Sequence, residues 1–146
     1  RGSIVVAEKS IAAGGVVFRN TEMSLQVVLV SRRNDDLCAL PKGRPESGES
    51  IRETAIREVK EETGLEVEII EYIGDVKYSF LNSNQKKVNK VVEYFLMIPI
   101  GGDFDKHDQE FDEVDWYDIH HASKILTHKN QTHIIDKAIE IIQSFN

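Results

Sequence analysis

The sequence is poor in cysteine and has no long hydrophobic run, and each shortage excludes a class of protein. Cys38 is its single cysteine, which excludes an intramolecular disulfide and favours a reducing compartment. No run of about 18 apolar residues is present, and the first residues lack the basic-then-apolar pattern of a secretion signal. We therefore expect a cytoplasmic protein that does not enter a membrane.

Positive charge is scarce relative to negative charge. The chain has 18 Lys and Arg residues against 25 Asp and Glu residues, which gives a formal net charge of −7 at pH 7. This balance argues against general nucleic-acid binding and against an anionic membrane surface. It is compatible with a polyphosphate substrate only if metal ions lie between acidic side chains and the phosphates.

The chain of 146 residues has the length of one domain, and about 70% of the unfolded surface is buried in domains of this size. No repeat, linker or low-complexity segment divides it, so we expect a single domain over residues 1–146. The first three residues, Arg1 to Ser3, resemble an expression-tag remnant and receive no functional weight. The sequence does not indicate an oligomeric state.

The most informative stretch runs from Gly43 to Leu65 and reads GRPESGESIRETAIREVKEETGL. Ser50 and Glu53 have the spacing of a capping box, which predicts a helix that begins at the following apolar position, Ile51. Gly64 is a stop signal for the same helix.

Three glutamates gather on one side of this predicted helix. At about 100° per residue, Glu58, Glu61 and Glu62 fall within a sector of roughly 100°, beside an apolar sector. Like charges at these spacings repel one another, so the cluster is either a solvated surface or a site that holds a cation. Carboxylate oxygens suit Mg²⁺ or Mn²⁺ better than zinc or copper.

The full stretch matches the pattern GX5EX7REUXEEXGU, in which U is aliphatic, and on these residues the chain resembles the Nudix hydrolases. The resemblance implies an enzyme that hydrolyses a nucleoside diphosphate linked to another group X, with divalent metals. It implies Glu58 and Glu62 as the main metal ligands, and Glu61 as a further ligand or as the base.

Two more residues complete the predicted catalytic set. Arg57 lies one turn before Glu61, so it could pair with the acid cluster and orient the carboxylates. Many family members also bring a glutamate from a downstream loop to the metals. Glu110 is the candidate for that ligand here, with Asp108, Asp112 and Glu113 as competitors.

Basic and aromatic residues outside the glutamate cluster are candidates for substrate binding. Lys42 and Arg44 flank Gly43 just before the helix, where they are either plain surface charges or a grip for terminal phosphates. Lys90 and Tyr78 lie on predicted strands. The Tyr78 ring could stack on adenine or could belong to the strand core.

The flanking residues suggest a substrate class. Leu40-Pro41-Lys42-Gly43, and Lys90 with the following YFL at 94–96, resemble the Nudix group that hydrolyses diadenosine tetraphosphate. The leading hypothesis is therefore Mg²⁺-dependent hydrolysis of this or a related dinucleoside polyphosphate by water attack on phosphorus. The alternatives are a nucleoside triphosphate pyrophosphatase, an RNA 5′ pyrophosphohydrolase, or a non-enzymatic Nudix-like nucleotide sensor, against which the mutually repelling glutamates argue.

The patterning predicts an α/β fold of the α+β kind, with a mixed sheet between helices. Predicted strands cover 4–6, 12–18, 25–30, 37–40, 67–78 with an interruption at Gly74, 88–100 and 113–117. Predicted helices follow Ser50, cover 119–126, and carry the apolar stripe from Ile134 to Phe145. With the first and last of these helices on opposite faces, this is an α/β/α sandwich, the fold that the resemblance also implies. The five histidines lack zinc-like spacing and are interpreted as surface residues.

Overall fold

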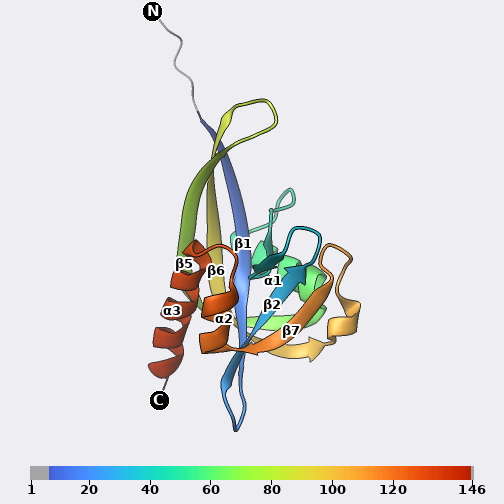
Figure 1. Cartoon of the computed structure of the whole chain (residues 1–146), viewed down its shortest axis with the longest axis vertical. Helices are drawn as coiled ribbons and strands as arrows, with labels where there is room; N and C mark the ends of the chain where they lie inside the picture. The colour runs from blue at the N-terminus through green and yellow to red at the C-terminus, as the bar shows by residue number, and fades with distance from the viewer. Residues whose placement is uncertain (1–6, 146) are drawn as a thin grey trace, which may run out of the picture.

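A computed structural model describes residues 7–145 (Figure 1). Within this range, seven strands form one mixed sheet whose main path is β3-β2-β1-β6-β5, while β4 pairs with β1 and β7 pairs with β2. The strands are β1 (Glu8–Asn20), β2 (Leu25–Arg32), β3 (Leu37–Ala39), β4 (Lys42–Gly43), β5 (Leu65–Leu81), β6 (Lys87–Gly102) and β7 (Glu113–Asp118). The strand predicted at residues 4–6 lies outside the described residues.

The helices cover both faces of this sheet. They are α1 (Ile51–Thr63), α2 (Ile119–Ile125) and α3 (Asn130–Gln143), and a short 3-10 helix η1 (Phe104–Lys106) follows β6. Successive strand residues point to opposite faces, so Val16 packs in the layer under α3 while its neighbour Val17 packs in the layer under α1. This arrangement confirms the predicted α/β/α sandwich. None of the helices in residues 7–145 has the length and apolar character needed to span a bilayer.

Both predicted ends of α1 are confirmed. The Ser50 hydroxyl accepts from the Glu53 backbone N–H (3.1 Å), and the Glu53 carboxylate accepts from the Ser50 backbone N–H (2.9 Å). Gly64 adopts a positive φ of 81° and donates its N–H to the Lys60 carbonyl (2.8 Å). These caps satisfy backbone groups that the helix itself leaves unpaired, and they fix the stretch over which the glutamates are displayed.

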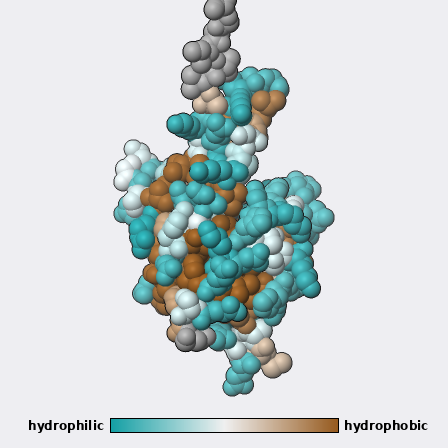
Figure 2. Space-filling view, turned by 90° about the vertical axis from the view of Figure 1, so that its left-hand side faces the viewer, coloured by the Kyte–Doolittle hydropathy of each residue, from teal (hydrophilic) through white to brown (hydrophobic). Residues whose placement is uncertain are grey.

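β5 and β6 form a long antiparallel hairpin whose tip extends beyond the body of the protein, beside the start of β1 (Figure 1). The predicted interruption at Gly74 was wrong as a strand break. β5 continues through this residue, and a register shift between Tyr72 and Gly74 accommodates the irregularity. Seen from the β5 and α3 side, hydrophobic residues spread over the body, whereas the projecting tip is largely hydrophilic (Figure 2).

β4 is a two-residue strand in a segment, 41–45, for which no strand was predicted. It pairs with Ala13 and Gly14 of β1, and a Cβ on Gly14 would overlap the Pro41 carbonyl and the Lys42 side chain. The glycine therefore permits a close approach of two backbones. This approach places Lys42 between the central sheet and α1.

Candidate active site

The acidic face of α1 meets β4 at Glu62. The Glu62 side chain is buried, with a residue exposure of 2%, and its Oε1 accepts a hydrogen bond from the Lys42 backbone N–H (3.1 Å). A carboxylate is rarely buried without compensation because its charged form loses hydration. This single backbone donor orients the carboxylate but leaves its charge without an ion-pair partner among the residues in the described range.

Arg57 ties the other acidic residues of the stretch together. Its guanidinium contacts Glu49 (Nε–Oε2, 2.6 Å), Glu58 (Nη1–Oε2, 3.1 Å) and Glu61 (Nη1–Oε2, 3.1 Å), and it donates to the Arg44 carbonyl (2.8 Å). The hydrogen bond from Arg57 is the main cause that lowers the pKa of Glu49 to about 2. The predicted pairing of Arg57 with Glu61 is present, and the fork of donors holds Glu58 in the same network.

The electrostatics of this face favour a bound cation. Burial raises the pKa of Glu62 to about 9, with the nearby charge of Glu110 as the second cause. Burial also raises the pKa of Glu58, and the charges of Glu61 and Glu110 add to that effect. A divalent cation among these oxygens would offset both the burial and the mutual repulsion, and oxygen-only donors match Mg²⁺ or Mn²⁺.

The carboxylates of this face do not converge on one point where they could all bind the same cation. Within residues 7–145, no group of three or more His, Cys, Asp or Glu side chains is gathered so that it could hold a metal ion directly. The ion pairs of Arg57 with Glu58 and Glu61 give the physical reason, because they draw these two carboxylates toward the guanidinium. The donor chemistry therefore fits the cation, and binding would require Glu58 and Glu61 to turn from Arg57.

Gly43 makes room for one of these carboxylates. A Cβ built on Gly43 would overlap the carboxyl carbon and both oxygens of Glu58. Any other residue at this position would therefore push the Glu58 carboxylate away from its present place beside β4. The first glycine of the motif is explained by this contact, since its φ is not in the left-handed region.

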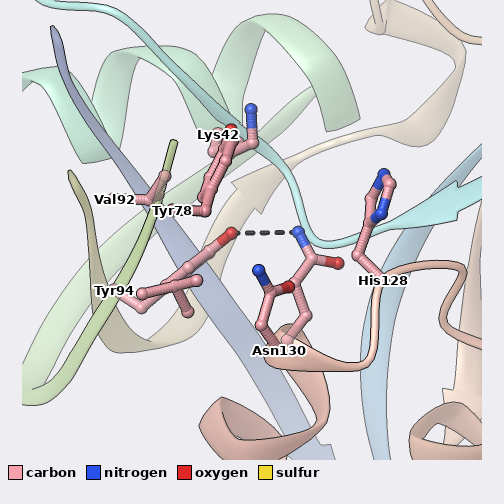
Figure 3. A pocket seen from close by; sticks show the side chains of 8 residues that line it. Lys42, Tyr78, Val92, Tyr94, His128 and Asn130 are labelled. Atoms are coloured by element: carbon pink, nitrogen blue, oxygen red, sulfur yellow. Dashed lines mark hydrogen bonds between the residues drawn. The ribbon is translucent and has the colours of Figure 1, made fainter. Parts of the chain in front are cut away.

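Two adjoining cavities open beside the acidic face. The first, of about 170 Å³, has Glu62 and Glu110 in its wall, and the second, of about 190 Å³, lies between the sheet and the start of α3 (Figure 3). Both cavities are lined by Lys42, Tyr78, His128 and Gln131. Glu110, predicted from its place before β7, is thus brought to the same cavity as Glu62.

Three cations gather near the acidic residues. Lys42 and Arg44 lie on and beside β4, and the half-buried Lys90 comes from β6. Burial is the first cause that lowers the pKa of Lys90, and the charges of Lys42 and Arg44 lower it further. Three neighbouring cations repel one another, so a bound anion would stabilise their arrangement.

Tyr78 is placed at the cavities rather than in the strand core. It lies opposite Lys90 in the β5–β6 register, is 37% exposed, and lines both cavities. Of the two alternatives for this residue, the structure therefore supports a ring that faces the cleft.

Four polar residues of the second cavity were not among the predicted site residues: Tyr94, His128, Asn130 and Gln131. His128 is exposed, as predicted for the histidines, and it also lines both cavities. Gln131 is 4% exposed although amides usually lie at the surface. The only available signal was the Asn130-Gln131 pair at the start of an apolar helical stripe, which does not distinguish a buried amide from a solvated one.

Comparison with known proteins places the chain in a family. The chain matches the family described as NUDIX domain over residues 9–138. A Mycobacterium tuberculosis protein named MutT4 is 34% identical over 137 residues, which cover 90% of this chain and 55% of that protein. An ADP-ribose pyrophosphatase from Methanocaldococcus jannaschii is 30% identical over 120 residues, which cover 80% of this chain and 66% of that protein.

The fold has solved counterparts as well. The structure of a Caenorhabditis elegans Ap4A hydrolase binary complex superimposes with a TM-score of 0.72 at 22% identity and covers 93% of this chain and 99% of that one. At this identity the likeness concerns the fold. The chain spans about half the length of MutT4 (55%) and about a third of two other curated relatives (32% and 34%). Because the family match covers most of its length and relatives carry the names of hydrolases and pyrophosphatases, the chain belongs to the Nudix hydrolase family.

Proposed function

We infer that the protein hydrolyses a nucleoside diphosphate linked to a group X, and that X completes diadenosine tetraphosphate or a related dinucleoside polyphosphate. The observation that carries this proposal is the meeting of opposite charges at two adjoining cavities. Glu62 and Glu110 line one cavity, and Lys42 lines both. Lys90 lies close enough to Lys42 for the Lys42 charge to lower the Lys90 pKa. A metal-bound polyphosphate is a ligand that satisfies both groups at once.

The glutamates would hold the cation. Glu58 and Glu62, joined by Glu61 and Glu110, offer the carboxylate oxygens for Mg²⁺ or Mn²⁺. When bound, such a cation neutralises phosphate charge and lowers the pKa of a coordinated water. Arg57 would orient Glu58 and Glu61 until the cation binds and draws them away, and a carboxylate that is not engaged with the cation, from Glu61 or Glu110, would accept the proton of the attacking water.

The cations and the tyrosine would hold the substrate. Lys42, Arg44 and Lys90 would supply positive charge for the phosphates, with Lys42 in the same cavity as Glu62 and Glu110. Tyr78 lines both cavities, where its ring could stack on a nucleobase.

A substrate panel tests this proposal. Purified protein is incubated with diadenosine tetraphosphate, ATP, dGTP, ADP-ribose or 5′-triphosphorylated RNA, with and without Mg²⁺ or Mn²⁺, and the products are separated by chromatography. We expect diadenosine tetraphosphate and water to give ATP and AMP, and only with the metal. Faster turnover of a nucleoside triphosphate or of the RNA would transfer the assignment to that alternative, and no turnover of any member would refute the proposed activity.

The Lys42→Ala variant should weaken substrate use chiefly through KM. Loss of one charge-assisted contact to phosphate corresponds to about 10- to 100-fold in kcat/KM, and the carboxylate network of α1 remains. Steady-state kinetics measure the effect, with Lys60→Ala as the control because Lys60 is exposed on α1 and lines neither cavity. Equal kinetics for both variants would remove Lys42 from the substrate site.

A further inference from the structure

The cavity of about 190 Å³ between the sheet and the start of α3 is smaller than a pocket for a whole nucleotide. Pockets that enclose drug-sized ligands are about 300–1,000 Å³, so this one accommodates a single ring system. Val76 and Val92 face each other in the β5–β6 register and form an aliphatic wall, next to Tyr78. Asn130 and His128 line the opposite side (Figure 3). An apolar wall opposite a polar edge suits a planar, heteroatom-bearing ring better than a phosphate.

A buried chain of hydrogen bonds defines the polar edge. The Leu40 backbone N–H donates to Gln131 Oε1 (3.3 Å), and Gln131 Nε2 donates to the Tyr94 hydroxyl oxygen (3.0 Å). A backbone N–H can only donate, so it sets which end of the Gln131 amide is the oxygen. The amide nitrogen must then face Tyr94, whose hydroxyl oxygen acts as the acceptor of this bond.

The hydroxyl hydrogen of Tyr94 therefore remains free for a ligand. Tyr94 is 1% exposed and lines the cavity, and across residues 7–145 no protein group accepts a hydrogen bond from its O–H. Burial raises the pKa of Tyr94, which keeps the proton on the oxygen at neutral pH. Figure 3 shows the hydroxyl directed across the cavity toward the α3 side, where the dashed line marks the bond with Gln131.

We propose that this cavity binds a nucleobase of the substrate and that Tyr94 O–H donates to an acceptor atom of the base, with Gln131 as the positioning residue. The proposal rests on the proposed hydrolysis of a nucleotide at the adjoining acidic face. A buried hydroxyl with a fixed donor direction selects an edge that carries a ring nitrogen or a carbonyl, and it rejects an edge that carries N–H or C–H. The cavity thus adds base selectivity to a charge-based phosphate site.

Atom-by-atom substrate changes test this proposal. The wild type and Tyr94→Phe are assayed on diadenosine tetraphosphate and on its counterparts built from 1-deaza-, 3-deaza- or 7-deazaadenosine, each of which replaces one acceptor nitrogen with C–H. One counterpart should lose about 3- to 10-fold in kcat/KM with the wild type, the size of one neutral hydrogen bond. Tyr94→Phe should use the parent as poorly as the wild type uses that counterpart, through KM, and should no longer distinguish the two.

Two further variants separate base reading from a structural effect. Tyr72→Phe is the matched control, because the Tyr72 hydroxyl bonds Glu93 (2.6 Å) on the same sheet and lines neither cavity. It should retain wild-type discrimination. Gln131→Met keeps the tyrosine but removes its amide partner, so discrimination should fall partway. Circular dichroism and thermal melting check that each variant is folded, and Gln131→Met provides the readout if Tyr94→Phe does not fold.

The outcomes distinguish this proposal from the proposed function. Turnover by the wild type with equal use of all deaza counterparts, or discrimination that survives in Tyr94→Phe, would overturn base reading by Tyr94 while leaving the activity in place. If the wild type cleaves none of these compounds, the proposed function fails. The same comparison is then made by calorimetric binding of ATP and its three deaza analogues, where loss of discrimination in Tyr94→Phe would support the cavity and its retention would refute it.

Discussion

Glu62→Gln should lower kcat by about 10³-fold or more while the protein stays folded. The substitution keeps the shape of the side chain and the hydrogen bond from the Lys42 backbone N–H, but it removes the negative charge that would hold the cation. Metal ions supply several kcal/mol of charge stabilisation in the transition state, and about 4 kcal/mol corresponds to 10³-fold. Steady-state kinetics with saturating Mg²⁺ measure the loss. Activity within tenfold of the wild type would show that Glu62 is not a metal ligand.

The same variant should be more stable than the wild type in the absence of metal. Glu62 has a folded-state pKa of about 9, above the value of about 4.3 in an unfolded chain. The folded state therefore holds a proton that the unfolded state has released between these two pH values. Wild-type stability should fall as pH rises through this window, by up to about 1.4 kcal/mol per unit, and the glutamine variant should lack this slope. Chelator-treated denaturant melts from pH 5 to 9 give the comparison.

Gly43→Ala should reduce activity by about 10²-fold or more with little loss of stability. The added Cβ would take the space of the Glu58 carboxylate, and a flexible side chain can move aside at small energetic cost. The displaced carboxylate would no longer stand beside Glu62, and small misplacements of a catalytic group cost about 10²-fold in rate. Kinetics and thermal melting of the same preparation separate the two effects.

Gly101→Ala is the matched control for this prediction. A Cβ on Gly101 would also meet a glutamate carboxylate, Glu66 Oε2 at 3.2 Å, but this pair lies at the end of the β5–β6 ladder and lines neither cavity. It should retain wild-type kinetics. A large loss of melting temperature in Gly43→Ala, with kcat unchanged, would contradict the role assigned to the glycine.

Local signals explain what the sequence predicted well. Ser50, Glu53 and Gly64 act within one helical turn of their partners, so the limits of α1 were predictable from spacing alone. The family motif then identified Glu58, Glu61, Glu62 and Arg57 as one group. In the structure Arg57 pairs with Glu58 and Glu61, whereas Glu62 accepts from the Lys42 backbone. Lys42 and Arg44 could be predicted as candidate substrate-binding residues because they flank Gly43, the first residue of the motif.

Non-local contacts explain what the sequence did not predict. β4 exists because Gly14 lets a distant segment approach β1, and nothing within the segment at 41–45 indicates a strand. Gln131 is buried because Leu40 and Tyr94, 91 and 37 positions away, satisfy its amide. Such pairings depend on the tertiary structure, whereas the residues themselves resemble ordinary surface and core positions.

Parallel pairing of β1 with β6 makes the site a late product of folding. The register joins Glu8 to Val88 and Val17 to Met97, residues that are 80 positions apart, and a strand pair with such a large separation forms slowly because a long loop must close first. Gln131, which bonds Leu40 and Tyr94, lies further along the chain than β6. During synthesis, α1 would emerge after β1 to β4 but before β5, β6 and α3, so the cavity between the sheet and the start of α3 can form only after Gln131 has emerged.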